Sequence, residues 1–208
     1  LRQLIMGFRA TQMVYVAAKL GLAHQLVNGP QTADAVANAV RLGRAGGDGV
    51  KLEGAGPMVS RVRALVGAGI PVMGHLGLTP QTATALGGYK AQGRTGAKAR
   101  QLFVDALALQ QAGCFAIVLE AVPARVAAHI SRALSIPTIG IGAGADCDGQ
   151  VLVWHDLLGI NEGPMPRFVK RYAEVAGEIR QGLAAFAAEV RDGSFPAAEH
   201  TYKISDEE

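Results

Sequence analysis

Ionisable side chains stand at the ends of three short apolar runs in this sequence. Lys51 and Glu53 alternate with apolar neighbours, His75 follows the run 70–74, and Glu120 follows the run 116–119. A buried charge without a partner is costly, so a fold that places one at the end of a buried strand has something to bind there. We therefore predict a binding or active site built from these residues.

Strand geometry brings the first two residues together. Alternation places Lys51 and Glu53 on one face of their strand. In parallel barrels and open α/β sheets, active sites form at the carboxyl ends of the strands. In the alternative interpretation, Glu53 and Glu120 bond only to loop backbone or cap a helix, and the residues by themselves leave both interpretations open.

The elements that would position these residues alternate along the chain. Short apolar runs alternate with longer amphipathic ones from residue 48 onward. This pattern predicts an α/β fold with parallel strands joined by helical crossovers. The expected strands are 49–53, 70–75, 115–120, 136–141 and 150–154, and the expected helices are 58–66, 97–112, 123–134 and 168–191.

The first part of the chain has a different pattern. Apolar residues recur at helical spacing over 1–26, and a turn signal at 28–30 precedes a short helical stretch that begins near Thr32. The sequence therefore predicts a helical segment ahead of the strands.

Composition excludes several classes of protein. Half of the 208 residues are hydrophobic and 18% are charged, which suits a folded core. The formal net charge is +3, but the basic residues are scattered, so we expect no nucleic-acid partner. The longest apolar runs fall far short of the roughly 18 residues that span a bilayer, so we expect no membrane segment. We expect the two cysteines, Cys114 and Cys147, to be reduced thiols of an intracellular protein.

Two further motifs, a glycine-rich run and a His-Asp pair, do not predict catalysis. The glycine-rich run 140–144 is followed by a turn into another strand, not by a crossover helix, which argues against nucleotide binding. We expect its glycines to allow close approach to a small ligand or close packing. The pair His155 and Asp156 is expected to form a local turn or cap.

Seven stretches closely resemble the ketopantoate hydroxymethyltransferase family, and the similarity extends over about residues 38–202. The stretches are 50–54, 70–81, 87–90, 92–94, 115–120, 136–144 and 147–153. The resemblance implies a (βα)8 barrel of the TIM type, a cytoplasmic homo-oligomer, and a role in pantothenate biosynthesis leading to coenzyme A. It implies the addition of a one-carbon unit from 5,10-methylenetetrahydrofolate to 3-methyl-2-oxobutanoate bound on Mg²⁺.

The resemblance also implies roles for individual residues. Glu120 would be the catalytic base that removes the C3 proton, and Lys51 would hold the substrate carboxylate. Glu53 would contribute to the metal site, directly or through a water, and His75 would line the substrate pocket. A divalent cation and an ammonium group would both stabilise the negative charge that forms.

The resemblance departs from the family pattern upstream of the first strand. It implies three earlier strands and two aspartate metal ligands, whereas Asp34 is the sole carboxylate before Asp48. Residues 1–37 are instead similar to the helical dimerisation segment of S-adenosylmethionine-dependent O-methyltransferases. We therefore predict a boundary between a helical segment, 1–37, and a partial barrel of about five βα units, 38–208.

Two hypotheses follow for function. The chain is a hydroxymethyltransferase, or it is a non-catalytic, chimeric or truncated barrel remnant that acts by association. Five βα units leave an unpaired sheet edge and an exposed apolar face, so we expect an oligomer or an aggregation-prone monomer.

Overall fold

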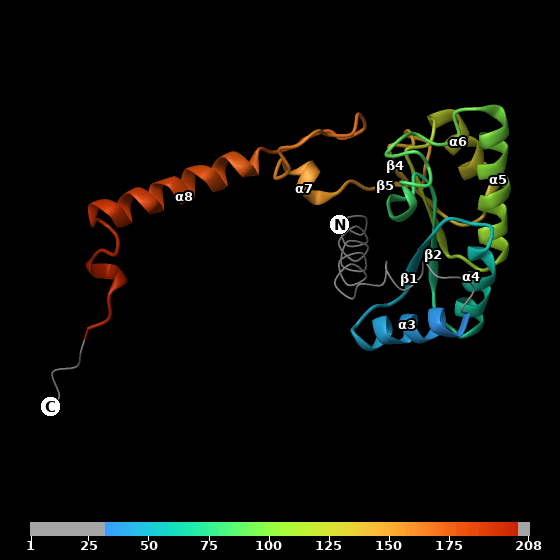
Figure 1. Cartoon of the computed structure of the whole chain (residues 1–208), viewed down its shortest axis with the longest axis horizontal. Coiled ribbons are helices and arrows are strands. Elements are labelled where there is room, and N and C mark those ends of the chain that lie inside the picture. Colours follow the sequence, from blue (N-terminus) through green and yellow to red (C-terminus); the bar gives the residue numbers. More distant parts are fainter. Residues whose placement is uncertain (1–31, 204–208) are drawn as a thin grey trace. The chain divides into compact units, whose positions relative to one another are not determined.

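Five parallel strands form one sheet in the order β1-β2-β3-β4-β5 (Figure 1). The computed structural model describes residues 32–203, which divide after Val151 into two compact units. The sheet lies in the first unit, and its strands are β1 (Val50–Glu53), β2 (Val72–Gly77), β3 (Ala116–Glu120), β4 (Thr138–Ile141) and β5 (Gly149–Gln150).

Helices connect most of these strands. In the first unit they are α3 (Thr32–Arg44), α4 (Met58–Gly67), α5 (Gly96–Gln111) and α6 (Ala124–Ala133), with a 3-10 turn, η1 (Pro80–Thr82). The second unit holds α7 (Trp154–Leu157), α8 (Val175–Asp192) and a 3-10 turn, η2 (Ala198–His200).

The strand order identifies the architecture. Each strand pairs with the next one in the sequence, and all four pairings are parallel. In a doubly wound sheet the order reverses at a switch point, whereas a barrel wall adds strands in sequence order. The predicted α/β fold of the TIM-barrel type is thus confirmed as an open, five-stranded wall within the described residues.

The two faces of the sheet have different surroundings. Helices α4, α5 and α6 lie along one face (Figure 1). The strand residues that turn toward them join the buried hydrophobic core, and they are Val50, Leu52, Val72, Leu76, Ile117 and Leu119. Because side chains alternate along a strand, Lys51, Glu53, His75 and Glu120 belong to the opposite face.

The last predicted strand is much shorter in the structure. It was expected over 150–154, but only Gly149 and Gln150 pair with β4. Val151 donates one more backbone hydrogen bond to Gly140, and the chain then enters α7. The prediction was wrong beyond residue 151 because β5 has a single neighbour along two residues, which gives 152–154 no ladder to join.

The terminal helix begins seven residues later than predicted. The apolar pattern suggested a start at Phe168, whereas α8 begins at Val175. Backbone N–H groups of Tyr172 and Val175 donate to the carbonyls of Leu157 and Leu158 at the end of α7. These contacts hold the segment before Val175 in a non-helical conformation.

Predictions for the amino-terminal part are tested only in part. The helix expected over 1–26 lies outside the described residues. The short helical stretch predicted from Thr32 is a full helix, α3, which continues to Arg44. The boundary between 37 and 38 falls inside α3 and stays a prediction. Among residues 32–203, none of the helices combines the length and the hydrophobicity that a membrane span needs.

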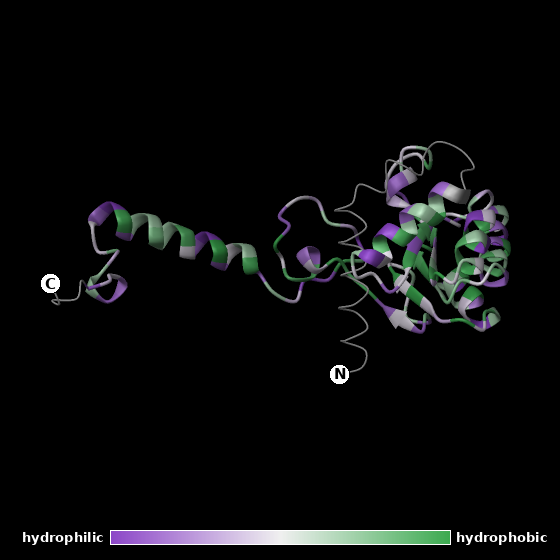
Figure 2. Ribbon diagram, turned by 90° about the horizontal axis from the view of Figure 1, so that it is seen from below, coloured by the Kyte–Doolittle hydropathy of each residue, from purple (hydrophilic) through white to green (hydrophobic). Residues whose placement is uncertain are grey.

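Helix α8 carries an uncovered row of apolar side chains. Ile179, Leu183, Phe186 and Val190 recur at spacings of four, three and four residues, and each is about half exposed or more. Hydrophobic positions accordingly recur along the whole helix (Figure 2). No residue of α8 is buried.

We expect Gly77→Ala to lower the free energy of unfolding by about 2–4 kcal/mol, since it combines backbone strain with overpacking. Gly77 has a φ of +93°, and a Cβ there would lie 2.1 Å from the carbonyl oxygen of Glu120. Gly96→Ala is the matched control, because its added methyl group would meet nothing within 4 Å. Urea unfolding followed by circular dichroism would test this, and equal midpoints for the two variants would contradict it.

Candidate active site at the carboxyl ends of β1, β2 and β3

Strand register brings the four predicted site residues to one edge of the sheet. Glu53 at the end of β1 is paired in register with His75 in β2. Glu120 at the end of β3 is paired with Gly77, two residues beyond His75. Lys51 lies on the same face of β1 as Glu53.

The side chains form a continuous chain of charge contacts. The Nζ of Lys51 lies 4.0 Å from Oε1 of Glu53, and Nδ1 of His75 lies 3.5 Å from the same oxygen. On the other side of the ring, Nε2 of His75 lies 3.2 Å from Oε2 of Glu120. The imidazole therefore stands between two carboxylates.

Burial decreases from the centre of this cluster outward. The side chain of His75 is 1% exposed, that of Glu53 is 8%, that of Glu120 is 15% and that of Lys51 is 28%. Neither ring nitrogen makes a hydrogen bond of good geometry within the described residues. The contacts of His75 are therefore ionic in character, and they require a protonated ring to be strong.

The surroundings favour that protonated form. Burial by itself lowers the pKa of His75, but the carboxylates of Glu120 and Glu53 outweigh burial and the repulsion from Lys51. The pKa of the imidazole therefore lies above its ordinary value. For Glu53, burial by itself raises the pKa. His75, the backbone N–H of Gln81 and Lys51 together outweigh burial and lower the pKa of Glu53 below its ordinary value.

These shifts define the pH range in which the cluster is intact. The contribution of His75 to stability is complete below its ordinary pKa and is lost as the pH rises through its raised folded-state pKa. The contribution of Glu53 is complete above its ordinary pKa and is lost as the pH falls through its lowered folded-state pKa. Both contacts are therefore fully formed at mildly acidic pH.

The two carboxylates differ in availability. Both oxygens of Glu53 are engaged, since Oε1 faces Lys51 and His75 while Oε2 accepts a hydrogen bond of 3.1 Å from the backbone N–H of Gln81. Within the described residues, Oε1 of Glu120 has no hydrogen bond or ion pair. Glu120 is therefore the carboxylate with an oxygen open to a ligand.

The contact from Gln81 was not predicted. The sequence places Gln81 in a stretch that resembles the family, but nothing in the sequence indicates that its backbone N–H reaches Glu53. The contact arises because η1 begins after only two residues beyond the end of β2 and turns its backbone toward β1.

The backbone around Glu120 is tightly constrained. Its carbonyl oxygen accepts a 2.8 Å hydrogen bond from the N–H of Leu78. The next residue, Ala121, has a φ of +50°, a conformation that non-glycine residues rarely adopt. The N–H of Ala121 donates to Ile141 and its carbonyl accepts from Gln92, so neighbouring segments hold the strained turn in place.

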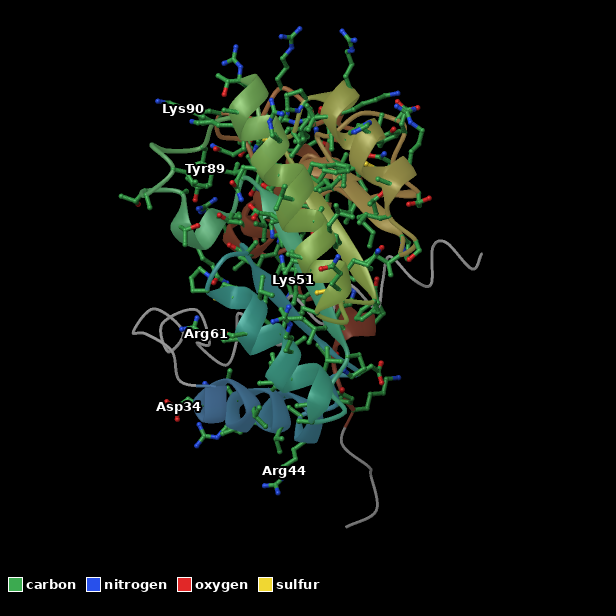
Figure 3. All side chains as sticks on the ribbon, turned by 90° about the vertical axis from the view of Figure 1, so that its right-hand side faces the viewer. Asp34, Arg44, Lys51, Arg61, Tyr89 and Lys90 are labelled. Carbon is green, nitrogen blue, oxygen red and sulfur yellow. The ribbon has the colours of Figure 1, made fainter. Side chains whose placement is uncertain are left out.

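The cluster offers few open oxygens to a magnesium ion, because both oxygens of Glu53 are engaged and Glu120 has one oxygen without a partner among the described residues. Mg²⁺ prefers octahedral oxygen coordination, usually with one or two carboxylates and several waters. Within 32–203, no group of three His, Cys, Asp or Glu side chains is placed to hold a metal ion. Asp34 is exposed on α3 (Figure 3). The described residues do not fit a magnesium site, and the metal role of Glu53 stays a prediction.

The remaining motifs have structural roles. A Cβ at Gly144 would lie 2.4 Å from that of Ala124, so this glycine of the run 140–144 allows the loop to pack on α6. No helix follows β4 directly, as predicted. His155 and Asp156 lie in α7, where Asp156 accepts a hydrogen bond from Asn161. Both cysteines are free, and burial raises the pKa of Cys114 to about 11.

We expect the His75 imidazole to titrate with a midpoint above 6.5, and Glu120→Gln to lower that midpoint because it removes a neighbouring negative charge. The measurement is a proton NMR titration, with the His75 signal assigned from its loss in His75→Gln. Glu178→Gln, an exposed position on α8, serves as the control and should leave the midpoint unchanged. A midpoint below 6.5 in the unaltered protein would refute the ionic cluster.

Comparison with known proteins agrees with the family resemblance found in the sequence. A sequence profile of the ketopantoate hydroxymethyltransferase family matches residues 9–198. The 3-methyl-2-oxobutanoate hydroxymethyltransferase of Nitratidesulfovibrio vulgaris strain DP4 is 63% identical over 174 residues, which is 83% of this chain and 57% of that protein. The protein of the same name from Moorella thermoacetica is 57% identical over 171 residues, or 82% of this chain and 64% of that protein.

Two further comparisons bear on length and structure. The chain spans about three-fifths of the length of the curated relatives it matches. A solved structure from Burkholderia cenocepacia, described as a lyase/mutase, gives a TM-score of 0.42 at 18% identity, over 84% of this chain and 63% of that chain. That score is too low to bear on the fold. The profile match and the relatives establish that this chain belongs to the ketopantoate hydroxymethyltransferase family.

Proposed function

We propose that this chain takes part in adding a hydroxymethyl group to 3-methyl-2-oxobutanoate to give 2-dehydropantoate, in the biosynthesis of pantothenate and coenzyme A. Membership of the family supports the reaction class. The observation that carries the proposal is the state of Glu120, whose Oε2 faces His75 while its Oε1 has no hydrogen bond or ion pair among the described residues.

Removal of the C3 proton is the step that these residues would perform. Glu120 takes the proton, and the electron pair of the C3–H bond moves into the C2 carbonyl to give an enolate. C3 then bonds to the methylene carbon of the donor as one carbon–nitrogen bond of that carbon breaks. A water replaces the second nitrogen and supplies the hydroxyl group, and the two donor nitrogens take up the proton from Glu120 and the proton released by the water. His75 positions Glu120, because its Nε2 lies 3.2 Å from Oε2, while Oε1 has no hydrogen bond or ion pair among the described residues.

Substrate binding would depend on Lys51. Its side chain is the most exposed of the cluster, at 28%, and its Nζ is 4.0 Å from Glu53. At that distance the ammonium group is close enough to be oriented by Glu53 and still has donors for a substrate carboxylate. The ammonium would offset the negative charge of the oxo acid as the enolate forms.

The donor and the metal are part of the proposal through the resemblance alone. We propose 5,10-methylenetetrahydrofolate as the one-carbon donor and retain Mg²⁺ as a requirement to be tested. No step above is assigned to the ion, because the described residues do not form a site for it.

Deuterium uptake at C3 tests the proton transfer without a folate. We expect the isopropyl methyl doublet of 3-methyl-2-oxobutanoate to lose its C3–H coupling in D₂O when the protein is present. Glu120→Gln should slow this exchange by roughly 100-fold or more, since it removes the base. Glu178→Gln is the matched control, and the comparison is made with and without Mg²⁺.

A second variant separates binding from proton transfer. We expect Lys51→Met to raise the half-saturating concentration of the oxo acid by roughly tenfold or more, because a charge-assisted contact is lost. Lys98→Met, at an exposed position in α5, is its control. No exchange above buffer from a folded chain would overturn the proposed activity and favour the barrel remnant that acts by association.

We also propose that the chain is a cytoplasmic homo-oligomer. Free cysteines are typical of a reducing compartment, and the apolar row on α8 is uncovered. Multi-angle light scattering tests the association: we expect a mass above that of the 21.6 kDa monomer. A monodisperse monomer would contradict it.

A further inference from the structure

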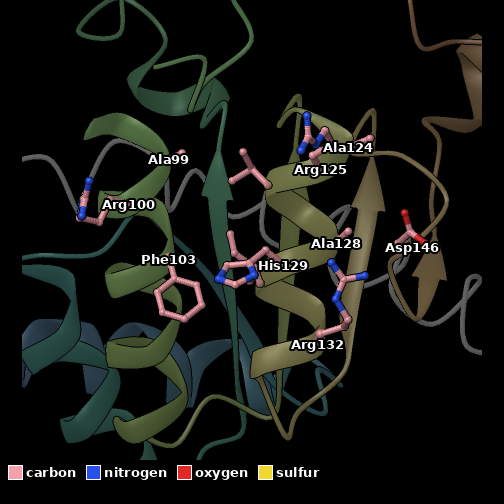
Figure 4. A pocket seen from close by; sticks show the side chains of 11 residues that line it. Ala99, Arg100, Phe103, Ala124, Arg125, Ala128, His129, Arg132 and Asp146 are labelled. Atoms are coloured by element: carbon pink, nitrogen blue, oxygen red, sulfur yellow. The ribbon is translucent and has the colours of Figure 1, made fainter. Parts of the chain in front are cut away.

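A groove between α5 and α6 lies apart from the catalytic cluster. It is open to solvent and has a volume of about 730 Å³. Helix α5 contributes Arg100 and Phe103, helix α6 contributes Arg125, His129 and Arg132, and the loop after β4 contributes Asp146 (Figure 4). None of the four predicted site residues lines it. It lies among the helices, whereas the cluster belongs to the opposite face of the sheet.

The groove carries a surplus of positive charge. Three arginines and one aspartate line it. All three arginines are exposed, and within the described residues none of them forms an ion pair or a hydrogen bond through its side chain. Guanidinium groups bind phosphate and carboxylate with paired hydrogen bonds, so unpaired arginines in a groove are suited to an anionic ligand.

Helical spacing sets the distance between the cationic ends. Arg125, His129 and Arg132 lie at positions i, i+4 and i+7 of α6, which places them on one face. Seven residues rise about 10 Å along a helix. Figure 4 shows Arg125 and Arg132 toward opposite ends of α6, with His129 between them.

Two aromatic rings line the middle of the groove (Figure 4). The rings of Phe103 and His129 lie 5.0 Å apart between centroids, with their planes inclined by 30°. An apolar or ring-shaped part of a ligand could rest on these rings while its ends meet the two arginines.

We propose that this groove binds a small molecule with two anionic groups, phosphate or carboxylate, about 10 Å apart along α6. Arg125 and Arg132 bind one anionic group each, and Phe103 with His129 contacts the part between them. The proposal is independent of the catalytic function, because it requires no residue of the cluster.

Binding of bisphosphates and monophosphates of one sugar tests the two-point contact. We expect fructose 1,6-bisphosphate to bind the full chain roughly tenfold or more tightly than fructose 6-phosphate by isothermal titration calorimetry, since one more charge-assisted contact forms. Arg132→Gln should abolish this difference. Arg63→Gln, an exposed position on α4, should preserve it. Matching circular dichroism and thermal unfolding would confirm that both variants are folded.

Further measurements in the same experiment identify the chemistry of the ligand and the place where the anion binds. Sebacate, a linear dicarboxylate, replaces the bisphosphate to distinguish carboxylate from phosphate. Equal affinity for the two sugar phosphates, binding unchanged by Arg132→Gln, or no binding by either the bisphosphate or sebacate would overturn the proposal. Competition by 3-methyl-2-oxobutanoate, or loss of binding in Lys51→Met, would place the anion at the catalytic cluster and would also overturn it.

Discussion

A buried imidazole between two carboxylates is the interaction on which the site and the sheet depend. His75 is 1% exposed, so a charged ring there is tolerated only if negative groups lie on both sides. The first carboxylate comes from β1 and the second from β3, the two neighbours of β2. The same contacts that tune the site therefore help to fix which strands are adjacent and in what register.

The two carboxylates of the site have different environments. Glu53 is held by an ammonium group, an imidazole and a backbone N–H, which stabilise it as an anion and leave it no free oxygen. Glu120 shares the same imidazole but keeps one oxygen available. One residue type thus provides a fixed counter-charge on β1 and, in the proposed reaction, the proton acceptor on β3.

Much of the fold could be read from local patterns, and the reasons for the exceptions are physical. The three charged strand ends were predictable because an apolar run closed by an ionisable residue is unusual unless partners exist. The end of β5 and the start of α8 were not, because they depend on whether a neighbouring backbone offers partners, as Leu157 and Leu158 do for Tyr172 and Val175. The arginine groove was missed because it needs α5 and α6 side by side.

Because side chains alternate between the two faces along each strand, this sheet is sensitive to the deletion or insertion of a single residue within a strand. In β3, Ile117 and Leu119 enter the core while Glu120 faces the other way. Deletion of one residue within the strand would exchange these two faces beyond the deletion. Glu120 would then take the core position of Leu119, and Leu119 would take the position of Val118, which is paired in register with His75. Insertions and deletions are therefore expected to accumulate in the loops of such a chain and to spare its strands.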